Sequence, residues 1–182
     1  MIEGTNIVLQ LFTDEDLDEY VELVNTYAEQ GEFLDARLRT KSSFRKNFEE
    51  TEGWWSEHRG FLAIKSKDGR LLGGIGFFRP HSMVAGYEVG YVLLRREDRG
   101  KGHGSEALRI FSAYLFDLKP IARLQLVTSE ENVAARRIAE KCGYVHEGTF
   151  PEHAFVRGEY VTSVQYGLLR KDCTPLAEVL AG

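Results

Sequence analysis

Long hydrophobic runs are absent from this chain of 182 residues. No apolar stretch approaches the ~18 residues that a helix needs to cross a bilayer, so we expect no membrane association. Cysteine is scarce as well: Cys142 and Cys173 have neither CxxC spacing nor the density of a disulfide scaffold, which predicts a protein of the reducing cytoplasm. The start, Met1 to Thr5, has no basic region followed by an apolar stretch, and we expect no signal peptide.

Proline is also rare, and basic residues are in the minority. The four prolines are too scattered to mark a linker, and the length predicts a single domain over 1–182, with its core at about 5–170 and a short tail at 171–182. Twenty-eight acidic side chains against 23 Lys and Arg give a net charge of -5, which disfavours a protein that wraps nucleic acid. The five histidines lack paired metal-ligand spacing, so we expect no metal site.

What the chain does contain is clear hydrophobic periodicity, in a composition that is 43% hydrophobic and typical of a globular protein. The periodicity predicts strands at 7–12, 60–65, 71–78, 85–94, 123–128, 144–150 and 161–169, and helices at 13–28, 43–58, 105–118 and 132–142. Hairpin strands followed by a strand–helix–strand order predict a single-domain α/β fold: a mixed, mostly antiparallel sheet with helices on both faces.

A segment rich in glycine and basic residues follows the strand at 85–94. It reads Arg95-Arg96-Glu97-Asp98-Arg99-Gly100-Lys101-Gly102-His103-Gly104-Ser105. Closely spaced glycines let backbone N–H groups turn toward one point, and the helix that follows adds the positive end of its dipole. Basic residues gathered here, in a protein that is acidic overall, indicate an anion such as a polyphosphate. The alternative is a glycine-rich connector whose charges are solvated.

Two known phosphate-binding loops do not fit this segment. A Walker A loop needs Ser or Thr after Gly-Lys, but Gly100-Lys101 is followed by Gly102. Gly102-x-Gly104-x-x-Ala107 matches a dinucleotide fingerprint, which belongs in the first strand–helix turn of a parallel sheet. Here it follows three strands whose pattern is antiparallel, so a nucleotide-dependent oxidoreductase is the weakest of the functional hypotheses.

Three stretches resemble one family. Arg99-x-x-Gly102-x-Gly104 resembles the R/Q-x-x-G-x-G/A signature of the GNAT superfamily of N-acetyltransferases, and the element order agrees with that fold. The stretch from Asn132 to Tyr144 is similar to the family's N-x-x-S/A…E-K-x-G-F/Y helix, and the ending at 157–170 is similar to the RimJ/RimL-like branch. The resemblance covers nearly the whole chain. It implies transfer of an acetyl group from acetyl-CoA to an amine on a protein N-terminus or a small molecule.

The resemblance also implies roles for residues around the loop. The backbone would hold the pyrophosphate of acetyl-CoA through Arg99, Gly100, Lys101, Gly102, His103, Gly104 and Ser105. A neighbouring strand would splay away and open a slot for the pantetheine arm, with the developing oxyanion bound by the amides of Val92, Leu93 and Leu94. Asn132 would bond the coenzyme or simply cap its helix.

Glu88 is the candidate general base. It lies eleven residues before Arg99, the offset at which relatives place a strand glutamate that acts through water, and its apolar or small neighbours are expected to raise its pKa. The alternative is a Glu88 that faces solvent on an edge or pairs with an arginine. Relatives protonate the leaving thiolate with Ser or Tyr at positions that are Ala135 and Ala139 here. The main alternative function is therefore a non-catalytic acyl-CoA binding or sensing domain.

The amine acceptor is open at this stage. The first two helices would form part of its site, and Trp54, Trp55, Phe33 and Tyr27 either line that site or belong to the core. The acidic net charge suits a cationic acceptor: a peptide N-terminus, a polyamine or an aminoglycoside.

Overall fold

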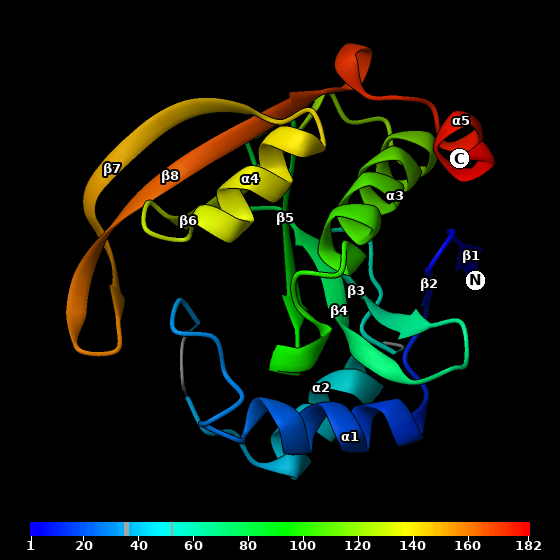
Figure 1. The fold of residues 1–182 in the computed structure, drawn as a ribbon, viewed down its shortest axis with the longest axis vertical. Helices are drawn as coiled ribbons and strands as arrows, with labels where there is room; N and C mark the ends of the chain where they lie inside the picture. Colours follow the sequence, from blue (N-terminus) through cyan, green and yellow to red (C-terminus); the bar gives the residue numbers. More distant parts are fainter. Residues whose placement is uncertain (35–36, 52) are drawn as a thin grey trace.

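A computed structural model describes residues 1–34, 37–51 and 53–182, and in this part of the chain eight strands form one sheet with helices on both faces (Figure 1). The elements are β1 Ile2–Glu3, β2 Ile7–Gln10, α1 Asp14–Val24, α2 Lys41–Glu50, β3 Arg59–Ser66, β4 Leu71–Phe78, β5 Gly86–Leu93, α3 His103–Leu118, β6 Arg123–Ser129, α4 Val133–Lys141, β7 Val145–Val156, β8 Glu159–Leu169 and α5 Leu176–Ala181. The strand order is β1-β2-β3-β4-β5-β6-β8-β7. Only the β5–β6 pair is parallel, so the predicted mixed and mostly antiparallel sheet is confirmed.

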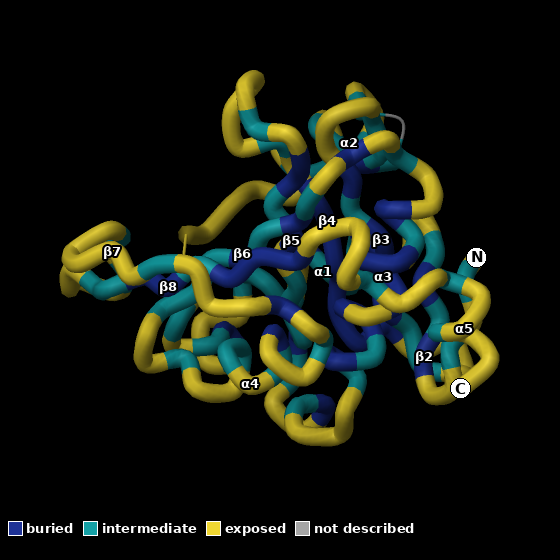
Figure 2. The backbone as a smooth tube through the Cα atoms, turned by 90° about the horizontal axis from the view of Figure 1, so that it is seen from above, coloured by how far each residue is buried: buried dark blue, intermediate teal, exposed yellow. Residues whose placement is uncertain are grey.

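Each face of the sheet buries its own hydrophobic cluster. On one face, Phe111 and Leu115 of α3 and Ala139 of α4 pack against the strands. On the other face, α1 contributes Leu17 and Val21, and α2 adds partly buried phenylalanines. Figure 2 shows the buried chain following the central strands β3 to β6 between these two layers. Helices therefore cover both faces of the sheet, with α3 and α4 on one face and α1 and α2 on the other.

Several predicted bounds were wrong, among them that of the strand predicted at 144–150, which extends to Val156. The helix predicted at 43–58 ends at Glu50, because Gly53 and Trp54 have left-handed φ values of 81° and 61° and turn the chain; position 52 lies outside the described residues. The first helix ends at Val24 instead of 28. Within the predicted tail at 171–182, Leu176–Ala181 forms α5, whose Leu176 and Val179 pack against the larger cluster.

Candidate functional site

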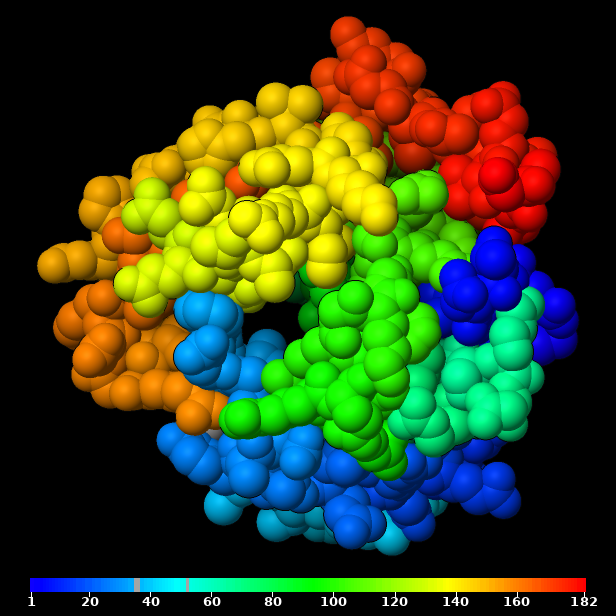
Figure 3. Space-filling model, in the orientation of Figure 1, coloured from blue at the N-terminus to red at the C-terminus, as the bar shows by residue number. Residues whose placement is uncertain are grey.

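The sheet divides between β5 and β6. These parallel strands pair only from Gly86–Arg123 to Glu88–Gln125, although β5 continues to Leu93 and β6 to Ser129. Beyond Glu88 the two strands separate, as the sequence interpretation expects, and leave a slot whose vertex is the Glu88–Gln125 pair. The surface is hollowed in this region, between α4, the start of α3 and the segment that follows α1 (Figure 3).

The amides that face the slot differ in part from those expected. The Leu94 amide donates to the Leu72 carbonyl of β4 (2.9 Å), so it is already engaged inside the sheet. The Val92 carbonyl also faces β4, because a Cβ on Gly73 would lie 1.9 Å from it. Backbone groups alternate in direction along an antiparallel pair, so the amides of Leu93 and Tyr91 point away from β4, into the slot. Tyr91 could have been found only by knowing this register.

Glu88 occupies the vertex of the slot. The amide nitrogen of Gln125 donates to its carboxylate (Nε2 to Oε2, 3.0 Å), and no arginine or lysine of the described residues forms an ion pair with it. Burial raises the pKa of Glu88, while the Gln125 hydrogen bond and the charge of His153 oppose the rise. The carboxylate is therefore held by a neutral partner on an interior strand, where it accepts a proton more readily than an exposed glutamate.

The glycine-rich loop ends at the start of α3. Gly102 is the N-cap, with a left-handed φ of 90°, and the first helical bond runs from the Glu106 amide to the Gly102 carbonyl (3.0 Å). The amides of His103, Gly104 and Ser105 therefore have no acceptor inside the helix. A Cβ on Gly102 would meet nothing within 4 Å, so the space beside these amides is open. This arrangement fits a diphosphate, because unpaired N–H groups and the helix dipole both favour negative charge.

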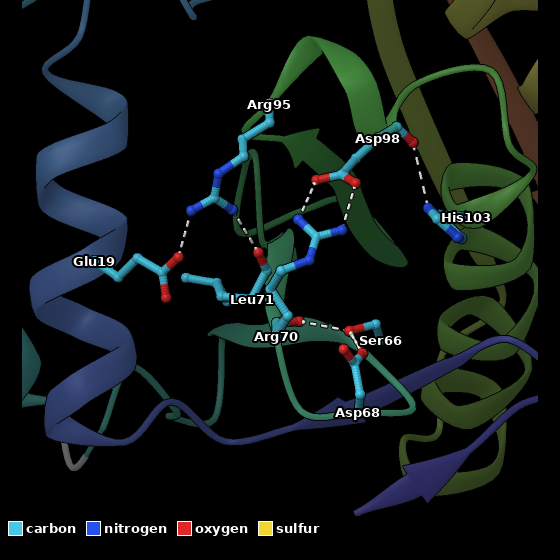
Figure 4. Close-up of polar contacts among 8 residues, drawn as sticks. All are labelled: Glu19, Ser66, Asp68, Arg70, Leu71, Arg95, Asp98 and His103. Carbon is cyan, nitrogen blue, oxygen red and sulfur yellow. Dashed lines mark hydrogen bonds and ion pairs between the residues drawn. The ribbon is translucent and has the colours of Figure 1, made fainter.

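An ion pair between a half-exposed arginine and a buried carboxylate fixes the path of this loop (Figure 4). The Asp98 side chain is 0% exposed and accepts two hydrogen bonds from Arg70, in the turn between β3 and β4, at 2.8 and 2.6 Å. These bonds lower the pKa of Asp98. The Asp98 carbonyl lies 3.3 Å from Nδ1 of His103, the first residue of α3. Asp98 thus connects the β3–β4 turn to the start of the helix.

The basic residues of the loop have separate roles. Arg95 binds Glu19 of α1 and the Leu71 carbonyl (Figure 4), and Arg99 donates to the carbonyls of Glu29 (2.8 Å) and Leu93 (3.2 Å). Both guanidinium groups are therefore engaged within the protein: Arg95 by a carboxylate and a backbone carbonyl, and Arg99 by two backbone carbonyls. The exposed cations are Arg96 and Lys101. The basic residues that the sequence gathers in this loop therefore do different things. Arg95 and Arg99 anchor neighbouring segments, whereas Arg96 and Lys101 are exposed to solvent.

Helix α4 lies against the other side of the slot. Its N-cap Asn132 accepts from the Ala135 amide (3.1 Å), so the capping role of this side chain is present. Ala139 is fully buried in the core and, like Ala135, offers no proton donor. The hydroxyl of Tyr91 is buried with no hydrogen-bond partner among the described residues, and burial raises the pKa of Tyr91. A Cβ on Gly104 would lie 3.2 Å from the Tyr91 ring, so this side chain reaches the start of α3.

A cavity of about 570 Å³ lies between the sheet and the first two helices. Its wall is rich in aromatic side chains, among them Tyr20, Phe44, Trp54, Phe61 and Phe78. A volume of this size is typical of a small-molecule site. The cavity reaches the slot strand, because Gly90, Tyr91 and Val92 of β5 also line it.

The two tryptophans separate across the sheet. Trp54 lines the cavity, and its buried indole nitrogen has no partner among the described residues. Trp55 packs instead against Phe77 and Tyr114, in the cluster on the opposite face. Tyr27 lies under the guanidinium of Arg157, 4.5 Å from its ring centroid. Neither Tyr27 nor Phe33 is among the described residues that line this cavity.

The structure also bears on metals and membranes. Within 1–34, 37–51 and 53–182, no group of three His, Cys, Asp or Glu side chains is placed to hold a metal ion. In the same described ranges, no helix combines the length and apolar character needed to span a membrane.

Comparison with known proteins gives a family match and a close structural likeness. The family model of the acetyltransferase (GNAT) domain matches residues 6–145. The Bacillus subtilis protein YdaF, provisionally named a ribosomal N-acetyltransferase, is 28% identical over 118 residues, which cover 65% of this chain and 64% of YdaF. This chain therefore matches less than two thirds of the length of that relative.

Two solved structures share the fold. The spermidine N-acetyltransferase of Vibrio cholerae, in complex with CoA and spermine, has a TM-score of 0.80 at 17% identity, and the match covers 92% of this chain and 97% of that one. RimL, a ribosomal alpha-N-protein acetyltransferase in complex with coenzyme A, has a TM-score of 0.77 at 16% identity, covering 91% and 95%. At these identities the likeness concerns the fold.

Proposed function

The chain belongs to the GNAT acetyltransferase family, and on that premise we propose that it transfers an acetyl group from acetyl-CoA to a primary amine, on a small molecule or a peptide N-terminus. The observation that carries the proposal is the juxtaposition of three features. A slot opens between β5 and β6, Glu88 stands at its vertex, and Tyr91 of the slot strand touches the open start of α3. In this proposal, one element of the site would bind an anion and another would accept a proton.

The coenzyme would be bound mainly by backbone. The amides of His103, Gly104 and Ser105 would hold its diphosphate, with the glycines at 100 and 102 giving close approach. Arg99 would act through the backbone it anchors, since its guanidinium binds the carbonyls of Glu29 and Leu93. Acetyl-CoA supplies a thioester, whose carbonyl carbon is open to attack by a neutral amine.

Glu88 would receive the proton of the attacking amine through water. Primary amines have pKa values of about 8 to 10 and arrive mostly protonated, so a base is needed. Burial raises the pKa of Glu88 toward the range where a carboxylate is an effective base. The amides of Leu93 and Tyr91 would stabilise the negative charge that develops on the carbonyl oxygen.

Tyr91 would supply the proton that the leaving thiolate takes up. Its hydroxyl stays protonated because burial raises its pKa, and it has no competing partner among the described residues. The carbon–sulfur bond breaks as the carbon–nitrogen bond forms, and Tyr91 regains a proton from solvent. This assignment replaces the side chains that are lacking at Ala135 and Ala139.

Three measurements test the proposal. Titration calorimetry with CoA should register binding, and a thiol reagent should detect CoA released from acetyl-CoA in the presence of a panel of primary amines. Binding without thiol release from any amine would favour the non-catalytic acyl-CoA domain, which the alanines at 135 and 139 suit. Thermal stabilisation by NADH in place of acetyl-CoA would refute both.

A further inference from the structure

The cavity beside the slot carries positive charge in an acidic protein. Arg39 and Arg59 are the only charged side chains among the described residues that line it, and neither pairs with a carboxylate of those residues. Other arginines of the described chain do hold carboxylates: Arg45, Arg70, Arg95 and Arg123. The charge of the cavity wall is therefore positive, whereas the net charge of the protein is -5. The net charge by itself would suit a cationic acceptor.

Arg59 and Glu88 share one row of the sheet. Arg59 is the cross-strand partner of Phe78, and Phe78 is the partner of Glu88. Cross-strand partners project on the same face, so the three side chains stand side by side above the sheet. Two inter-strand spacings separate the backbones of Arg59 and Glu88, which is about 9.6 Å. A base and an unpaired cation therefore stand at the two ends of one row.

The space between them is flat and apolar. Phe78, 46% exposed, lies between the two charged groups, and Gly76 and Gly90 form the adjacent row. A Cβ on Gly90 would meet nothing within 4 Å, so the cavity floor is open there. Trp54 stands in the wall with a φ of 61°, a strained value for a residue with a side chain, and such strain is concentrated at functional sites.

We infer that the acceptor is a primary amine on a flat apolar body, such as an aromatic ring, with a carboxylate at the end remote from the amine. This inference rests on the proposed function. The amine would lie at Glu88, beside the slot, the body over Phe78 and Gly90, and the carboxylate at Arg59, whose planar fork matches a carboxylate. A polyamine, with cationic groups along its length, would bring positive charge to Arg59 and bind poorly.

Matched amines test the inference. Phenethylamine supplies the amine and ring, 4-(2-aminoethyl)benzoate adds a carboxylate at the far end, L-phenylalanine places it beside the amine, and spermidine is the polycation. We expect kcat/KM, measured by thiol release from acetyl-CoA, to be about 10- to 100-fold higher for 4-(2-aminoethyl)benzoate than for phenethylamine, as for a hydrogen-bonded charge pair. The kcat/KM of L-phenylalanine should exceed that of phenethylamine by a smaller factor, and spermidine should be the poorest substrate.

Variants of the cavity test whether Arg59 and the open floor at Gly90 produce this preference. Arg59→Met should reduce the ratio between the two ring amines to about 1, whereas Arg45→Met, on the same side of the sheet but outside the cavity, should leave it unchanged. Gly90→Leu should weaken binding of 4-(2-aminoethyl)benzoate without lowering Tm, since its side chain would enter open space. Arg59 is exposed, so its replacement should not impair folding.

Calorimetry with the same amines separates this inference from the proposed function. If CoA binds but no amine releases thiol, the enzyme assignment fails, and the amine titrations still decide the question of the acceptor. Tighter binding of 4-(2-aminoethyl)benzoate than of phenethylamine, lost in Arg59→Met, supports the inference. It is overturned if spermidine is preferred, if the two ring amines behave alike, or if their difference survives Arg59→Met.

Discussion

Replacing Arg70 by methionine would remove the partner of a fully buried carboxylate at the start of the coenzyme loop. The Asp98 side chain is 0% exposed and receives both of its charged hydrogen bonds from Arg70. Breaking a buried pair from one side costs about 3–5 kcal/mol. The Arg70 side chain is 43% exposed, so screening reduces the loss to about 2–3 kcal/mol. For a chain of this size, that corresponds to a fall in Tm of roughly 4–12 °C.

The stability gap between wild type and Arg70→Met should depend on pH. Hydrogen bonds from Arg70 lower the pKa of Asp98 in the folded state below its unfolded value of about 3.9. A carboxyl whose folded pKa is depressed contributes stability above the unfolded pKa and loses it as pH falls through the folded value. The gap should therefore be complete at neutral pH and shrink below about pH 4. Urea unfolding at a series of pH values measures it.

Two controls make this prediction specific. Arg96→Met removes an exposed arginine from the same loop and should change Tm little. Asp98→Asn should cost less than Arg70→Met, because the Arg70 that it leaves unpaired can reach water. CoA affinity should fall in Arg70→Met but not in Arg96→Met if the pair positions the loop. A gap that persists unchanged to pH 3, or a shift in Tm no larger than that of Arg96→Met, would refute the reasoning.

Three further predictions concern the site itself. Gly102→Val should abolish CoA binding in calorimetry, since its left-handed φ of 90° strains valine and the side chain would fill the open space beside the helix amides; retained affinity would place the diphosphate elsewhere. Glu88→Gln should keep CoA binding and lose the rise in kcat/KM that wild type shows as pH passes upward through the raised pKa of Glu88, where the base becomes ionised; an unaltered pH profile would show that Glu88 is not the base. Tyr91→Phe should bind CoA normally and lower kcat by about 10²- to 10⁴-fold, the usual range for a general acid; a kcat within twofold of wild type would exclude that role.

Sequence periodicity was sufficient for the layers of this fold because both faces of the sheet are buried. Strands from β3 to β6 appeared within one or two residues of their predicted bounds, as did the start of the loop. Helix ends were harder to predict, because they depend on tertiary contacts and on backbone conformation. Trp54 takes a left-handed φ that no propensity rule assigns to tryptophan, and this turn cut the predicted second helix short.

The part of the candidate site that the loop backbone forms could be predicted from the sequence. The part that depends on how β5 pairs with β4 could not. Gly102 permits a left-handed φ that other residues rarely adopt, so the position of the loop could be predicted from the sequence alone. Which amides of β5 face the slot depends on pairing with β4, and a shift of one residue exchanges Leu94 for Leu93. The sequence also could not show which basic residues of the loop are free to meet an anion. It does not distinguish Arg99, which anchors backbone, from Lys101, which is exposed.

Because Ala135 and Ala139 cannot donate a proton to the thiolate, we propose that another element supplies the donor. A proton donor must lie near the slot, but it need not come from α4, because β5 borders the same space. Tyr91 enters from the strand and touches Gly104, where an added Cβ would also lie 3.4 Å from Ile138 of α4. The tyrosine ring and Ile138, the sequence neighbour of the buried Ala139, therefore both lie close to the start of α3. In the proposed mechanism an alanine in the helix is compatible with catalysis, because Tyr91 of the strand would donate the proton.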